Sequence, residues 1–177
     1  MKMKLQNSFF ITCIILISAH CSYGAQKCYK EWADLASDLF DVAHDASFTG
    51  GSFTLCKNTI FNIESSLKIW SSNVVIECEE EECVVNGGTY QIFITEGLYG
   101  PPTGVQLRGI TFSSAEVINV IAYGSENMQI DVVNCKFEGS IKSTTIGIFA
   151  SGANTNINVL DSLFTNNIYM AAVGAGE

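Results

Sequence analysis

The segment Val105–Phe112 reads VQLRGITF, and the chain repeats its pattern as IDVVNCKF at Ile130–Phe137 and as INVLDSLF at Ile157–Phe164. In each copy apolar residues recur at every second position, which is typical of a strand with one buried face. A bend residue then precedes a second short apolar stretch that ends in phenylalanine. We therefore expect each copy to form two short strands joined by a tight bend.

Equivalent residues of the three copies align once the final phenylalanines are superimposed. The bend positions are glycine, asparagine and aspartate, types that tolerate left-handed backbone or turn on their own side chain. They are Gly109, Asn134 and Asp161. The inward positions should stack as a core ladder. This ladder comprises Leu107, Val132 and Val159 in one row and Phe112, Phe137 and Phe164 in another.

The copies begin 25 and 27 residues apart, a period typical of solenoid repeats. A further apolar run follows each copy, at residues 117–124, 145–152 and, more weakly, 169–176. Three short strands per turn predict an all-β chain whose equivalent strands stack in parallel. We expect about five coils within residues 51–177.

The first two coils precede these copies and carry an acidic insertion. The first coil spans Phe53–Trp70 with a bend at Asn58, and the second begins at Val74. In the second coil, four acidic residues replace the single bend residue between Cys78 and Cys83. They are Glu79, Glu80, Glu81 and Glu82. We expect a solvated loop closed by a Cys78–Cys83 disulfide, and calcium binding is the weaker alternative because the D-x-D-x-D-G spacing is missing.

The chain begins with the features of a secretory signal peptide. Lys2 and Lys4 precede the apolar run Phe9–Ile17, and small residues follow near Gly24. We expect residues 1–24 to be cleaved, with an uncleaved anchor as the alternative. The apolar run is too short for a membrane span, so we expect a secreted protein with no membrane-spanning segment after cleavage.

An amphipathic helix is predicted over Tyr29–Asp45, within an N-terminal segment of residues 25–50. Its apolar residues recur at helical spacing. They are Trp32, Leu35, Ala36, Leu39, Phe40 and Ala43. We expect this helix to cap the open end of the first coil, with a partner-binding helix as the alternative.

The cysteines agree with an oxidising compartment. After removal of the leader, Cys28 and Cys56 could join the helix segment to the first coil, and Cys78 could pair with Cys83. Cys135 remains, and its alignment with Ile110 predicts a small buried apolar residue. The residues indicate no cofactor, and apart from the calcium alternative they indicate no metal site.

Charge limits the choice of partner. The net charge is −9, and loss of Lys2 and Lys4 with the leader would make it −11. Nucleic acid is therefore not expected as a ligand, and an anionic polysaccharide would be repelled unless a divalent cation bridged the two. The loop that contains the two prolines presents Leu98 and Tyr99 as a candidate contact for sugar or protein. Alternatively, the tyrosine lies back on the coil.

The C-Y-x-x-W segment from Cys28 to Trp32, the FTLCKNT segment Phe53–Thr59 and coils of the V-x-L-x-G-I-T-F type carry a family resemblance. From about Cys28 onward, the chain resembles secreted right-handed single-stranded parallel β-helix proteins of the pectin-lyase-like superfamily, especially uncharacterised ones of unicellular algae. This resemblance implies a right-handed coil. It implies little about activity, because the superfamily includes lyases, hydrolases, adhesins and cell-surface proteins.

The sequence does not match the catalytic patterns of the enzymes that this resemblance includes. A pectate-lyase-like site needs an arginine base beside calcium-holding aspartates, but Arg108 aligns with Val133 and Leu160 in the later copies. A polygalacturonase-like site needs paired aspartates, and Asp131 and Asp161 do not occupy equivalent positions. Arg108 therefore remains only a candidate binding residue.

We accordingly expect a secreted, non-catalytic scaffold that binds polysaccharide or a cell-surface protein. The alternative is a truncated or divergent polysaccharide lyase or glycoside hydrolase. Because residues 169–176 form the last strand segment and no polar cap follows, we also expect a longer solenoid cut short at its C-terminus. An open last coil would favour end-to-end self-association.

Overall fold

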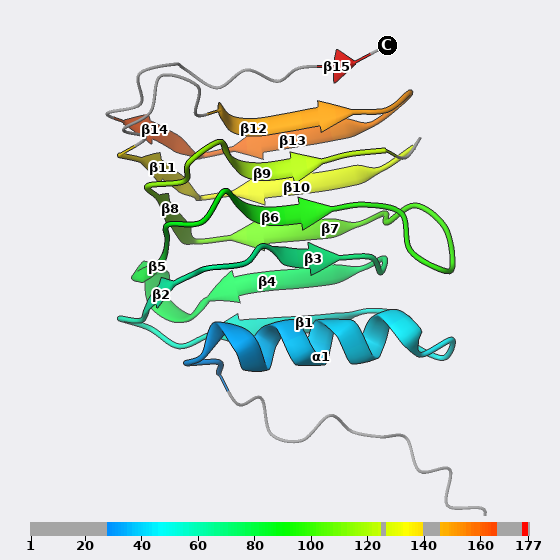
Figure 1. The fold of residues 1–177 in the computed structure, drawn as a ribbon, viewed down its shortest axis with the longest axis horizontal. Coiled ribbons are helices and arrows are strands. Elements are labelled where there is room, and N and C mark those ends of the chain that lie inside the picture. Colours follow the sequence, from blue (N-terminus) through cyan, green and yellow to red (C-terminus); the bar gives the residue numbers. More distant parts are fainter. Residues whose placement is uncertain (1–27, 125–126, 140–145, 166–174, 177) are drawn as a thin grey trace, which may run out of the picture.

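The computed structural model describes residues 28–124, 127–139, 146–165 and 175–176. They form one α-helix and three parallel sheets, wound as a β-solenoid of about four turns (Figure 1). The coils stack one above another from helix α1 (Trp32–His44) to β15 (Ala175–Gly176). The all-β parallel solenoid expected from the repeats is therefore confirmed, whereas the expected signal peptide lies outside the described residues.

Each sheet takes one strand from every coil. Sheet A contains β1 (Gly51–Leu55), β4 (Val74–Cys78), β7 (Val105–Arg108), β10 (Gln129–Val133) and β13 (Asn156–Leu160). Sheet B contains β2 (Ile60–Asn62), β5 (Cys83–Asn86), β8 (Ile110–Ser113), β11 (Lys136–Glu138) and β14 (Leu163–Thr165). Sheet C contains β3 (Leu67–Ile69), β6 (Tyr90–Ile94), β9 (Ile118–Ala122), β12 (Ile146–Ser151) and β15.

The corner between sheets A and B has left-handed backbone in every coil. Gly109 has φ 64°, Asn134 has φ 52° and Asp161 has φ 49°. The first coil uses Asn58 and the second uses Glu80, which lies in the short 3₁₀ turn η1 (Glu79–Glu81). A left-handed residue turns the chain sharply within one position, so one such residue is enough to send it from sheet A to sheet B.

The core fills the space between the three sheets with stacked apolar rows. Leu107 pairs in register with Val132, which pairs with Val159 in the next coil. The rings of Phe112 and Phe137 stack at 5.1 Å, and those of Phe137 and Phe164 at 4.7 Å. All six members of the predicted ladder are therefore stacked on an equivalent residue of a neighbouring coil. Arg108, the partner of Val133 in sheet A, lies on the outer side.

Two amide side chains are buried among these apolar rows. Gln91 and Asn119 are 0% and 1% exposed. The Gln91 side-chain amide donates to the carbonyl oxygens of Val85, Gly87 and Ser113, at 3.1, 3.0 and 2.7 Å. Asn119 donates to the Gln91 side-chain oxygen at 2.8 Å. Gln91 thus ties together carbonyl groups of two coils at the corner between sheets B and C.

Helix α1 lies along the end of the first coil (Figure 1). Its buried residues are Trp32, Leu35, Leu39, Val42 and Ala43. The Trp32 ring packs 5.6 Å from that of Phe61, and its indole N–H donates to the Ser65 carbonyl at 3.2 Å. The helix begins later than predicted because Tyr29 makes a parallel bridge to Leu55 instead.

One residue of the predicted apolar helix stripe behaves differently from the rest. Phe40 is 51% exposed rather than buried in the core. It follows Leu39 by about 100° around the helix, so it lies at the edge of the buried face. Within the described part of the chain, no helix is long and apolar enough to cross a bilayer.

Candidate functional site

An open groove of about 420 Å³ lies where the end of α1 meets the first two coils. The helix contributes Phe40, Ala43 and His44. Trp70, directly after β3, and residues 96–98, in the loop that follows β6, complete the lining. Side chains from three separate segments therefore meet in one groove, and most of them are apolar or aromatic.

Aromatic rings form one wall of this groove. The ring centroids of Phe40 and His44 lie 4.3 Å apart, and Phe40 meets Trp70 edge to face at 6.1 Å. The Lys68 ammonium lies 5.7 Å from the centre of the Trp70 ring. Rings held in contact lose little conformational freedom when a ligand binds, so this wall is suited to recognition.

The opposite wall is a tight loop that holds the two predicted contact residues. Gly97 and Gly100 exchange backbone hydrogen bonds of 3.2 and 3.3 Å, and Leu98 and Tyr99 lie between them. A side chain at Gly97 would place its Cβ 2.4 Å from the Trp70 carbonyl oxygen, so the close approach of loop and coil requires glycine. Leu98 and Tyr99 are 73% and 65% exposed.

These exposures bear on the alternative that the tyrosine lies back on the coil. Tyr99 reaches toward the helix, where its hydroxyl donates a long 3.5 Å hydrogen bond to the His44 carbonyl oxygen. Its ring nevertheless remains mostly exposed, as does the side chain of Leu98, which lines the groove.

Four groove residues are not indicated as binding residues by the sequence, because only the packing of α1 brings them together. They are Phe40, His44, Trp70 and Glu96.

Arg108 lies elsewhere, on the outer face of sheet A. Its guanidinium donates to the side-chain oxygen of Gln106. Val133 is its partner in the next coil, as the alignment predicted, but Glu77 is its partner in the previous coil. The two later copies carry no acidic residue at this position, and Glu77 aligns with Arg108 only through the second coil, which begins at Val74.

Polar side chains from all five strands continue this outer face. Ser52 donates to Glu77 at 2.8 Å, and Asn158 donates to Asp131 at 2.9 Å. Gln106 and Asp131 are partners in register, and so are Asp131 and Asn158. The outer face of sheet A, as the term is used below, means the polar side chains of Ser52, Glu77, Gln106, Arg108, Asp131 and Asn158. The register places Val75, Val133 and Leu160 on the same side of the sheet.

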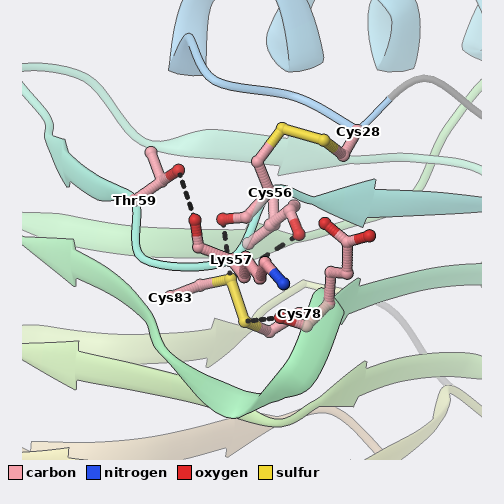
Figure 2. Close-up of a disulfide and its surroundings, with 8 residues drawn as sticks. Cys28, Cys56, Lys57, Thr59, Cys78 and Cys83 are labelled. Atoms are coloured by element: carbon pink, nitrogen blue, oxygen red, sulfur yellow. Dashed lines mark hydrogen bonds between the residues drawn. A yellow bond between two sulfur atoms is a disulfide. The ribbon is translucent and has the colours of Figure 1, made fainter.

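Both predicted disulfides are present near the end of sheet A (Figure 2). Cys28 joins Cys56, which links the segment before α1 to the first coil. Cys78 joins Cys83 across the acidic insertion. The two bridges are neighbours, because Cys83 Sγ lies 3.3 Å from the Cys56 carbonyl oxygen.

The acidic insertion makes an ion pair rather than a cluster of ligands. The Glu80 carboxylate lies 3.0 Å from the Lys57 ammonium, and this contact raises the pKa of Lys57. Among the residues whose positions are described, no group of three or more His, Cys, Asp or Glu could hold a metal ion. The calcium alternative therefore gains no support from the geometry of residues 79–82.

Cys135 is a free, buried thiol, as the alignment with Ile110 predicted. It lies in the corner between sheets A and B, where its Sγ is 3.5 Å from the carbonyl oxygens of Leu107 and Val133. Burial raises the pKa of this thiol to about 11, so it stays protonated at neutral pH. A protonated, inaccessible thiol is a poor nucleophile, which argues for a packing role.

Comparison of the chain with protein-family models, curated proteins and solved structures gave no significant match. The class of protein therefore follows from the fold: a disulfide-linked parallel β-solenoid with three sheets.

Proposed function

We propose that this chain is a secreted right-handed β-helix protein that acts as a non-catalytic extracellular scaffold and binds neutral polysaccharide. The observation that carries the proposal is the row of polar side chains on the outer face of sheet A. Carboxylate, amide and guanidinium groups there offer both acceptors and donors, which is what the hydroxyl groups of a sugar require. These groups come from successive coils, so they repeat along the stack.

The geometry of the sheet suits an extended polymer. Neighbouring strands of a sheet lie about 4.8 Å apart, a spacing comparable to the length of one pyranose residue. A polysaccharide lying along the stack would thus meet Glu77, then Gln106 or Arg108, then Asp131, then Asn158. The intramolecular hydrogen bonds of Arg108 and Asn158 fix these side chains in place, and each retains further hydrogen-bonding capacity.

Charge supports a neutral rather than an anionic ligand. The chain carries a net charge of −9, and Arg108 is its single arginine. An acidic polymer would experience long-range repulsion, whereas a neutral sugar pays no such penalty and can still hydrogen-bond to carboxylates. Neutral polysaccharide is therefore the class of ligand that the composition favours.

The proposal also includes secretion, a capping role for α1, a right-handed coil and a total of about five coils. Two disulfides support secretion, since such bonds persist in oxidising compartments. The buried face of α1 against the first coil supports its role as a cap. A right-handed coil is supported by the strong preference of parallel β-crossover connections for that hand. About five coils agree with the five strands in each sheet.

The experiment must separate binding from degradation. Purified protein is run through native gels that contain β-glucan, xyloglucan or galactomannan, and is separately incubated with polygalacturonate and alginate with and without calcium. We expect retardation by at least one neutral polymer and no unsaturated or reducing product. Calcium-dependent product from either acidic polymer would establish the lyase or hydrolase alternative, for which Glu77 beside Arg108 supplies the chemistry to examine first.

A further inference from the structure

The groove between α1 and the loop of residues 96–98 has no part in the proposed polysaccharide face. Phe40 and Leu98, which line this groove, are 51% and 73% exposed, and Tyr99, which follows Leu98, is 65% exposed. Single exposed apolar side chains are ordinary on protein surfaces, but a contiguous group that lines a groove marks a site of interaction. We therefore expect this groove to bind a ligand other than the polysaccharide.

The lining of the groove includes one carboxylate, that of Glu96. Glu96 is exposed, lines the groove and takes part in neither ion pair of the described residues. Ala43 and His44 belong to the last turn of α1, and the C-terminal end of a helix carries partial negative charge that favours cations. None of the lining residues is lysine or arginine.

The aromatic wall also favours a cation. The face of an indole ring attracts an ammonium group within about 6 Å. Trp70 already makes such a contact with Lys68, at 5.7 Å. Lys68 does not line the groove, so its charge opposes a second cation without occupying the site.

We propose that this groove binds a lysine side chain presented by a partner protein. The four-carbon stem of lysine would cover the apolar surface of Phe40, Ala43 and Leu98, while its ammonium group would meet Glu96 and the Trp70 ring. A small ammonium ion lacks this stem and would leave the apolar walls exposed in an open groove. A neutral sugar could hydrogen-bond to the carboxylate, but it carries no positive charge to pair with Glu96 or to lie on the indole ring.

The experiment is a titration of the isotope-labelled full chain with a blocked pentapeptide that has one lysine between glycines, followed by heteronuclear NMR. The two tryptophans of the chain give an internal control. The Trp70 indole signal should shift, because its ring lines the groove. The Trp32 indole signal should not, because Trp32 is 9% exposed, does not line the groove and donates its N–H to the Ser65 carbonyl.

Three variants test the role of charge. Glu96→Gln should weaken binding about tenfold, because it removes the carboxylate that pairs with the ammonium. Glu64→Gln, which removes another exposed carboxylate that lies outside the groove, should leave the affinity within about twofold. Lys68→Met should strengthen binding about threefold, since it removes the competing ammonium from Trp70.

Matched ligands complete the test. The same peptide with norleucine in place of lysine keeps the stem and loses the charge, so it should bind at least about fivefold more weakly. Equal binding of the two peptides would contradict the proposal, as would binding that survives Glu96→Gln unchanged. A Trp70 shift caused by neutral sugar but not by the lysine peptide, or no Trp70 shift with either, would also overturn it.

Discussion

At the scale of single residues, the corners of the coils depend on left-handed backbone, and not every residue there is well suited to it. Asparagine, aspartate and glycine occupy four of the five corners between sheets A and B, and Glu80 occupies the fifth with φ 64°. A long side chain gains no local hydrogen bond that offsets the steric cost of this conformation. Glu80 is therefore a strained position in an otherwise consistent series.

Replacement of Glu80 by asparagine should stabilise the protein. The variant Glu80→Asn relieves backbone strain worth about 1 kcal/mol, and loss of the exposed pair with Lys57 offsets little of this gain. Urea unfolding measures the change. The control is Glu79→Asn, whose backbone φ is not positive. An equal gain in both variants would show that charge relief within the acidic run, rather than backbone strain, is responsible.

The buried thiol of Cys135 should make stability depend on alkaline pH. Its pKa is about 11 when folded against an ordinary value of 9.0, so the unfolded chain releases the proton first. The contribution is fully present below pH 9 and is lost as pH rises toward about 11, amounting to about 2–3 kcal/mol. Chemical denaturation at several pH values should therefore show a shallower alkaline decline for Cys135→Ala. Parallel curves for the two proteins would contradict this assignment.

At the scale of elements, the two disulfides differ in how much chain they constrain. Cys28–Cys56 spans a sequence separation of 28 and attaches the segment before α1 to the first coil, whereas Cys78–Cys83 spans 5. On the chain-entropy description, a longer closed loop gives greater stabilisation. We therefore expect the Cys28–Cys56 disulfide to contribute more to the free energy of unfolding than the Cys78–Cys83 disulfide.

Paired alanine replacements measure this difference. The Cys28→Ala, Cys56→Ala double variant should lose about 3.5 kcal/mol of unfolding free energy, and the Cys78→Ala, Cys83→Ala double variant about 2 kcal/mol. Guanidinium unfolding under non-reducing conditions gives both values. If the bridge across the insertion proved the more stabilising, its effect would have to arise from native-state packing of Cys83, which is fully buried, rather than from chain entropy.

At the scale of the whole molecule, the parts predicted from sequence are those that repeat. Alternation at Val105–Phe112 and its copies gave the strands, and Gly109, Asn134 and Asp161 gave the corners, because each coil must meet the same steric conditions as its neighbours. Inward-facing Cys135 followed from the same alignment. The local sequence pattern was sufficient to predict the position of a residue wherever its neighbours are the equivalent residues of adjacent coils.

What could not be predicted depends on contacts between segments that do not repeat. The exposure of Phe40 and its meeting with Trp70 follow from how α1 lies on the first coil, which helical periodicity alone does not determine. The burial of Gln91 depends on carbonyl groups from two coils. Glu80 stands in a run of four glutamates, so the sequence alone does not indicate which of them adopts the left-handed backbone conformation.

The outer face of sheet A is the central feature of the proposed function, and a comparison of two sheets tests it most directly. The measurement is the dissociation constant for the neutral polysaccharide that retards the protein. The test variant is Gln106→Ala with Asn158→Ala. The control is Asn62→Ala with Asn86→Ala, which removes a matched amide pair joined at 2.8 Å on sheet B.

We predict that the sheet A variant weakens binding about tenfold or more, because each lost hydrogen bond contributes roughly 0.5–1.5 kcal/mol. The sheet B variant should bind like the unmodified protein. Equal affinities for all three proteins, or no binding of any neutral polysaccharide by the unmodified chain, would contradict the account.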